Sequence, residues 1–147
     1  MRKLITALVL VSGAAMVPGL ALAEHDARHA TLYKQPQCGC CTAHADYLRA
    51  NGFLVDELEV RQPQAFKEDL GIPREMAGCH TIKVGGYLVE GHVSADLIDR
   101  LLDERPDVAG ISLPGMPTGS PGMPGPKPKP HQVYSFSDNG IAEYGTQ

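Results

Sequence analysis

The pattern of apolar and polar positions between residues 31 and 60 predicts a strand, a helix and a second strand, in that order. Residues 31–33 form a short β-rich run that is followed by a turn. Residues 41–51 place apolar side chains at helical spacing, and an Asn-Gly pair ends this helix. Residues 53–60 alternate apolar with acidic positions, as a strand does when one side faces solvent. A β-α-β unit is the expected result.

The same patterning continues beyond this unit. Residues 64–70 are amphipathic enough for a short helix, which a glycine and a proline close. Residues 81–84 and 87–90 are β-rich runs around a Gly-Gly turn and predict a hairpin. Residues 95–104 carry the apolar stripe of a further helix. The order β-α-β-α-β-β-α predicts an α/β fold, with a central mixed sheet and flanking helices.

The C-terminal segment has a different composition. Residues 113–130 are rich in proline, glycine and lysine, which excludes a helix or a central strand. Residues 133–136 and 141–144 flank an Asn-Gly turn and form a last small hairpin, which either extends the sheet or hangs from it. We expect four segments: residues 1–23, a flexible lead at 24–29, the main domain at 30–112, and an extension at 113–147.

The first segment has the pattern of a secretory signal peptide. Residues 4–17 are almost all apolar, follow two basic residues, and lead to the small-residue triplet that ends at Ala23. This run is too short to span a bilayer, and no later segment is as apolar, so we expect an exported, soluble mature chain cleaved after Ala23.

Charge narrows the range of partners. The full chain has 13 basic and 17 acidic residues, a formal net charge of −4. Cleavage after Ala23 removes Arg2 and Lys3 and no acidic residue, which leaves 11 basic against 17 acidic residues and a net charge of −6. The remaining basic residues form no run, so the electrostatic surface that nucleic acid requires is missing.

The candidate chemistry lies in the cysteines. Three of the four, Cys38, Cys40 and Cys41, occupy one strand-to-helix junction, and Cys79 precedes the hairpin together with His80. In the predicted element order, the residue before the third strand lies near the loop after the first, so we expect the four thiols to converge. A helix N-terminus also lowers the pKa of cysteines placed there.

Three kinds of site fit these cysteines. Structural disulfides are common in exported chains, and of the local pairs only Cys38 with Cys41 closes without marked strain. A structural zinc site would use Cys38, Cys41, Cys79 and His80, but neighbouring residues on a strand point to opposite faces, and Cys40 would be left over. Crowded thiolates bridge several soft ions, and sulfur ligands select Cu(I). A copper site is the better match.

Further candidate ligands are histidines and methionines. His44 lies one helical turn after Cys41, His80 adjoins Cys79, and His92 follows the predicted hairpin. Met116 and Met123 repeat one Pro-Gly-Met-Pro frame, in which a thioether can bind a soft metal or simply fill space.

A set of short motifs in fixed order resembles a known family. They run from Leu32-Tyr33-Lys34 and the Cys-Gly-Cys-Cys motif through Cys79-His80-Thr81 and Glu90-Gly91-His92 to the two Pro-Gly-Met frames. Together they are similar to the periplasmic CopG-type family of copper resistance, over roughly residues 31–123. This sequence departs from family members that carry an aromatic residue at the position of His44 and a histidine at that of Tyr47.

The resemblance implies a thioredoxin-like, metal-binding domain at 30–112 and a periplasmic role in copper resistance. It further implies a multinuclear Cu(I) cluster held by Cys38, Cys40, Cys41 and Cys79, which sequesters copper, passes it on or changes its oxidation state. Partners would be copper ions, other periplasmic copper-handling proteins or a copper-exporting transporter. A conventional enzyme is not expected, although a thiol-disulfide oxidoreductase using Cys38 and Cys41 is the alternative. A thiol and an imidazole stand where thioredoxins have a cis-proline, which favours metal binding over that alternative.

Overall fold

A computed structural model describes residues 27–147 of the chain. The predicted signal peptide, at 1–23, lies outside the described residues, as does most of the predicted lead. Within residues 27–147, no helix is both long enough and apolar enough to cross a membrane.

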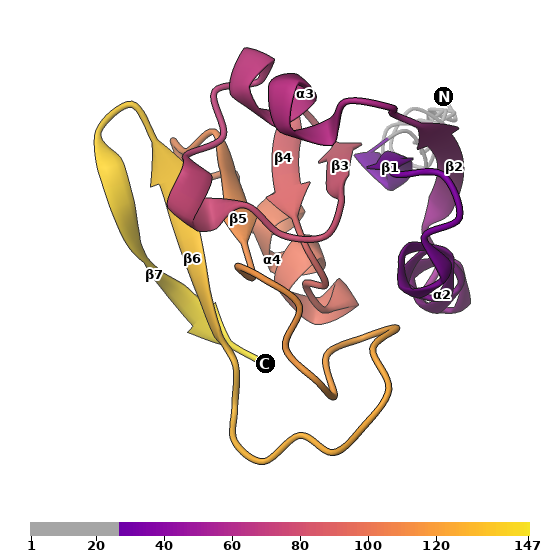
Figure 1. Cartoon of the computed structure of the whole chain (residues 1–147). Coiled ribbons are helices and arrows are strands. Elements are labelled where there is room, and N and C mark those ends of the chain that lie inside the picture. The colour runs from indigo at the N-terminus through magenta and orange to yellow at the C-terminus, as the bar shows by residue number, and fades with distance from the viewer. Residues whose placement is uncertain (1–26) are drawn as a thin grey trace, which may run out of the picture.

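The described chain contains seven strands, three α-helices and one turn of 3-10 helix (Figure 1). Their bounds are β1 His29–Lys34, α2 Gly39–Ala50, β2 Leu54–Glu59, α3 Pro63–Asp69, η1 Arg74–Met76, β3 Thr81–Val84, β4 Tyr87–Glu90, α4 Ala95–Glu104, β5 Gly110–Ser112, β6 Gln132–Ser137 and β7 Gly140–Thr146.

All seven strands join one mixed sheet in the order β2-β1-β3-β4-β5-β6-β7. β1 pairs in parallel with β2 and β4 with β5, and the other neighbours are antiparallel. The terminal hairpin, β6 and β7, extends the sheet by pairing with β5. The predicted α/β fold, with a central mixed sheet and flanking helices, is confirmed; its thioredoxin-like character stays a prediction.

The two faces of the sheet are covered by different helices. Leu32 of β1 belongs to the main core together with Leu48 of α2 and Leu101 of α4. The next residue, Tyr33, points to the other face, where its ring lies 4.7 Å from that of Phe66 in α3. This alternation follows from the pleat of the strand, and it places α2 and α4 on one face and α3 on the other.

Element boundaries differ from the prediction at several points. Helix α2 begins at Gly39, two residues before the predicted start, so Cys40 and Cys41 lie in its first turn. Strand β1 begins at His29, inside the segment predicted as a flexible lead. Strand β5 was not predicted, because three residues are too few to show a periodic pattern; all three are buried.

Candidate metal centre

Cys38 stands at the N-cap of α2, in extended backbone conformation, and its side chain makes no capping hydrogen bond. The Cys38 sulfur is therefore not engaged by the helix backbone. Because α2 starts directly after Cys38, both Cys40 and Cys41 project from the first helical turn. Cys41 is fully buried against the core, whereas Cys38 and Cys40 are half-buried.

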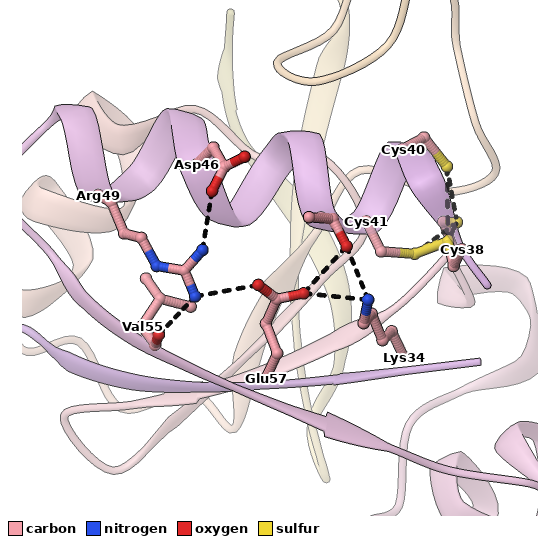
Figure 2. Close-up of polar contacts among 10 residues, drawn as sticks. Lys34, Cys38, Cys40, Cys41, Asp46, Arg49, Val55 and Glu57 are labelled. Atoms are coloured by element: carbon pink, nitrogen blue, oxygen red, sulfur yellow. Dashed lines mark hydrogen bonds and ion pairs between the residues drawn. A yellow bond between two sulfur atoms is a disulfide. The ribbon is translucent and has the colours of Figure 1, made fainter. Parts of the chain in front are cut away.

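The four cysteines converge, as the element order predicted. The Cys79 Sγ lies 3.5 Å from the Sγ of Cys38, 3.5 Å from that of Cys40 and 3.4 Å from that of Cys41. Cys38 and Cys41 form a disulfide, shown as a yellow bond in Figure 2, and Cys40 and Cys79 are free thiols. We call these four residues the sulfur cluster.

The sulfur cluster opens to solvent. A cavity of about 450 Å³ is lined by Cys38, Cys40 and Cys79 and also by Met116. Met116 belongs to the Pro/Gly-rich segment and is 57% exposed. An ion can therefore reach these sulfurs without any rearrangement of the fold, and a thioether lines the same cavity.

Buried polar groups hold Cys79 in place. The Gly78 N–H donates a hydrogen bond to the Glu90 carboxylate at 2.8 Å, and the Thr81 hydroxyl donates to the same carboxylate at 2.6 Å. Glu90 is fully buried and pairs with the ammonium of Lys67, which is also buried. The sequence reasoning missed Lys67 and Glu90. A lysine in a short amphipathic helix gives no signal that it turns inward.

Gly78 is required by close packing. A Cβ at this position would lie 2.6 Å from the Gly91 Cα, so only glycine lets the segment before Cys79 approach the turn after β4. The Gly91 N–H also donates a hydrogen bond to the His80 carbonyl at 2.8 Å, which joins the same two segments. Cys79 and His80 are thus fixed relative to His92, which follows Gly91.

The surroundings of Cys79 favour the protonated thiol. Burial, together with the neighbouring Cys40 sulfur, raises the pKa of Cys79 to about 12, against the weaker opposing effect of Lys67. The predicted lowering of cysteine pKa by the helix N-terminus therefore does not extend to Cys79, which lies outside the helix. A metal ion that binds this sulfur must displace a proton.

A network of hydrogen bonds and ion pairs attaches both ends of α2 to the sheet (Figure 2). The Lys34 ammonium donates to the Thr42 hydroxyl at 2.7 Å, and that hydroxyl donates to the Glu57 carboxylate at 3.0 Å. Lys34 and Arg49 each also contact Glu57 at 3.0 Å. Burial alone would raise the pKa of Glu57, but the hydrogen bonds from Lys34, Arg49 and Thr42 outweigh it and lower that pKa.

The three predicted histidine ligands form a group of their own. His44, His80 and His92 are all fully buried, and one ring nitrogen from each lies within 4.8 Å of the others. The His44 Nδ1 lies 2.8 Å from the His80 Nε2. We call these three residues the histidine cluster. Cys79 and His80 thus contribute to two clusters, as expected for neighbouring side chains that point to opposite faces.

This arrangement bears on the alternatives raised by the sequence. Cys38 and Cys41, the local pair that the spacing allows to close, form a disulfide, whereas Cys40 and Cys79 remain free, so the alternative in which all four cysteines form structural disulfides is not present. The zinc set of three cysteines with His80 is not brought together, because the His80 ring lies against His44 and His92 and away from the sulfurs.

Burial keeps the histidine rings neutral. It lowers the pKa of His44 to about 3, with a further contribution from His92, and the hydrogen bond to the Val93 carbonyl opposes the shift only in part. Burial also lowers the pKa of His80, helped by the repulsion of His44, His92 and Lys67. The pKa of His92 is lowered by burial as well, against the hydrogen bond to the Pro121 carbonyl. All three rings therefore present lone pairs rather than charges.

The Pro/Gly-rich segment covers the histidine cluster. In Figure 1 this segment runs from the end of β5 past α2 before it returns to β6. The His92 Nδ1 donates to the Pro121 carbonyl at 2.7 Å. A Cβ on Gly122, whose φ is +77°, would lie 2.5 Å from the His44 backbone nitrogen. The glycine therefore allows direct backbone packing of this segment on α2.

Comparisons with known proteins agree with the motifs. Residues 76–123 match the family described as "Protein of unknown function, DUF411". No curated protein matches the chain. Two solved structures do, named "Copper resistance protein copG" in Form 1 and Form 2, each 37% identical and covering 81% of this chain. The matches extend over 96% and 97% of those chains, with TM-scores of 0.74 and 0.75. The chain belongs to the CopG family.

Proposed function

We propose that this chain is an exported copper-binding protein that holds several Cu(I) ions in a thiolate cluster formed by Cys38, Cys40, Cys41 and Cys79. The observation that carries the proposal is the position of Cys79, whose sulfur lies within 3.5 Å of the other three. Soft thiolates are preferred ligands of Cu(I). The similar solved proteins are named for copper resistance.

Bridging explains why more than one ion is expected. A sulfur that lies close to three others can share its lone pairs among several copper ions, because thiolates bridge soft metals. One tetrahedral zinc would use each of the four sulfurs once. The number of ions bound per chain therefore distinguishes a multinuclear copper site from a single zinc site at the same cysteines. The name of the related proteins favours copper.

The disulfide limits when copper can bind. Reduction of the Cys38–Cys41 bond takes two electrons and two protons and yields two thiols, so the reduced chain offers four sulfur ligands and the oxidised chain two. Sequestration, transfer and redox change of copper would all start from the reduced form. Met116, which lines the same cavity, offers a thioether that would bind a soft ion beside the sulfurs.

The proposed place of action is the periplasm, with residues 1–23 as the cleaved signal peptide and residues 30–112 as the thioredoxin-like, metal-binding domain. A periplasmic copper-handling protein or a copper-exporting transporter would be the exchange partner. The open cavity at the sulfur cluster supports such exchange, because an incoming donor can reach the cysteines directly.

The test is a stoichiometric titration. The chain is reduced, freed of reductant under anaerobic conditions, and titrated with Cu(I) in competition with bathocuproine disulfonate. More than one Cu(I) per chain, with loss of most of this capacity in Cys79→Ser, is the expected result. One ion or none contradicts the proposal, and one Zn(II) bound more tightly than copper supports the zinc site instead.

A second candidate function is thiol-disulfide exchange. Cys79 Sγ lies 3.4 Å from Cys41 Sγ, within reach of the Cys38–Cys41 disulfide. Attack requires a thiolate, however, and the pKa of Cys79, raised to about 12 by burial and by Cys40, leaves little of that form at neutral pH. Rapid reduction of insulin by the metal-free chain, with Cys38 and Cys41 as the redox pair and dithiothreitol as the electron donor, would favour this second function over copper binding.

A further inference from the structure

We propose that the histidine cluster is a second metal site, separate from the sulfur cluster, and that it binds one Cu(I) ion. Its ligands are His44, His80 and His92. The site uses none of the cysteines, so it goes beyond the function proposed above and either assignment can fail alone.

Three different elements supply the ligands. His44 comes from α2, His80 from the segment that enters β3, and His92 from the turn after β4. The His44 Nδ1 and His80 Nε2 are 2.8 Å apart, and the third ring nitrogen lies within 4.8 Å. Three imidazoles that bind one ion at about 2.0 Å have their nitrogens about 3.5 Å apart. Small shifts of the rings are enough to reach this arrangement.

Backbone carbonyls already fix the protons of two rings. The His44 Nε2–H donates to the Val93 carbonyl at 2.9 Å, and the His92 Nδ1–H donates to the Pro121 carbonyl at 2.7 Å. Their other nitrogens, His44 Nδ1 and His92 Nε2, are consequently bare lone pairs. Metal-binding histidines typically donate the second ring N–H to such a carbonyl.

The His80 ring changes its tautomer when the ion binds. In the empty cluster the His80 Nε2–H donates to the His44 Nδ1 lone pair. An ion between these two nitrogens takes the place of that proton, which moves to the His80 Nδ1. The proton therefore stays on the same ring, and no charge other than that of the ion enters the site.

An unpaired polar atom points to a ligand rather than to a packed core. The His92 Nε2, the nitrogen left to bind the ion because the Nδ1–H is donated to Pro121, is buried and has no hydrogen-bond partner among the described residues. Buried polar groups normally find a partner, because leaving one unpaired is costly. A purely structural role would be served better by apolar side chains of similar size.

The charge and enclosure of the site favour Cu(I). Within the described residues, the group contains no carboxylate to neutralise a dication, and all three rings are shut off from solvent. Lys67 also acts on His80 with a positive charge. Cu(I) brings one charge and is satisfied by three ligands, whereas Zn(II) and Cu(II) would need a further ligand from water.

The experiment removes the free thiols and leaves the histidines. The Cys40→Ser/Cys79→Ser variant is purified with the Cys38–Cys41 disulfide intact, so that none of the four cysteines remains a free thiol. It is titrated with Cu(I), kept reduced by ascorbate, in competition with bathocuproine disulfonate. We expect one Cu(I) per chain. Adding His92→Asn should weaken this binding at least tenfold, while adding His29→Asn, at an exposed histidine in β1, should leave it unchanged.

Ring nitrogens provide the second readout. In ¹⁵N spectra of the histidine side chains, Cu(I) should shift three rings and convert His80 from the Nε2–H to the Nδ1–H tautomer. A folded Cys40→Ser/Cys79→Ser variant that binds no Cu(I), or binding that survives His92→Asn, overturns the second site. Tighter binding of one Zn(II) than of Cu(I) overturns the choice of metal. The multinuclear cysteine site is tested separately, by the Cu(I) that the reduced wild-type chain binds beyond the amount bound by the Cys40→Ser/Cys79→Ser variant.

Discussion

The sulfur cluster and the histidine cluster share the dipeptide Cys79-His80, yet they differ in access and in charge. Cys38, Cys40 and Cys79 line a cavity of about 450 Å³, and one disulfide determines how many of the four cysteines are free to bind metal. The histidine rings are buried, neutral and covered by the backbone around Gly122. Cys79 and His80, the two residues before β3, therefore point into two different environments. The solvent-accessible sulfur cluster is suited to the exchange of metal ions, and the buried histidine cluster is suited to their retention.

Loss of Cys79 should have the largest effect, because it should remove copper binding at the sulfur cluster and leave the histidine cluster intact. Cys79→Ser removes the sulfur that contacts all three other cysteines, so the reduced variant should lose most of its Cu(I) capacity. Anaerobic titration against bathocuproine disulfonate measures this, with His29→Asn as the control. Retention of the full capacity would show that Cys79 does not hold the cluster together.

Oxidation should act on one cluster only. Protein that keeps the Cys38–Cys41 disulfide has two free thiols in place of four, so it should bind at most half as much copper at the sulfur cluster as the reduced chain. The histidine cluster contains no group that oxidises under the same mild conditions. Metal analysis of both forms after gel filtration checks this, and equal copper contents would contradict the role of the disulfide thiols.

Alanine substitutions of two glycines, Gly122 beside the histidine cluster and Gly39 beside the sulfur cluster, allow a comparison of their effects on the unfolding free energy. Gly122→Ala introduces a Cβ against the His44 backbone at a φ of +77°, which should cost about 2 kcal/mol of unfolding free energy. Gly39→Ala, between the cysteines, meets nothing within 4 Å at a helical position and should be neutral or slightly stabilising. Urea denaturation measures both. Equal stability of the two variants would mean that the segment does not rest on α2.

The smallest effect is expected at Glu57. Glu57→Gln weakens the ion pairs that attach α2 to the sheet, at a cost of about 1 kcal/mol near neutral pH. The folded-state pKa of Glu57 is below its unfolded value, so its contribution is complete above the unfolded pKa and disappears as the pH falls through the folded one. The difference in Tm between wild type and variant should therefore vanish in acid. A constant difference at every pH would exclude the carboxylate charge as its cause.

Much of the fold could be predicted from periodicity. Apolar spacing indicated α2, α3 and α4, because each helix buries one face against the sheet, and two β-rich runs around a Gly-Gly turn indicated the hairpin of β3 and β4. Strand β5 could not be predicted, since three residues carry no period. The early start of α2 at Gly39 was also missed, because a glycine next to two cysteines looks like a turn in the sequence.

The candidate site was predicted as a set of residues, but not as an arrangement. The four cysteines, the three histidines and the order of elements that brings Cys79 to the start of α2 could be predicted from the residue pattern alone. The meeting of His44 and His92 with His80, apart from the sulfurs, and the support of Cys79 by Glu90 and Lys67 became evident only in the folded chain. The reason is that side-chain direction at strand entrances and close backbone approaches, such as those at Gly78 and Gly122, depend on packing between distant segments. No local pattern encodes them.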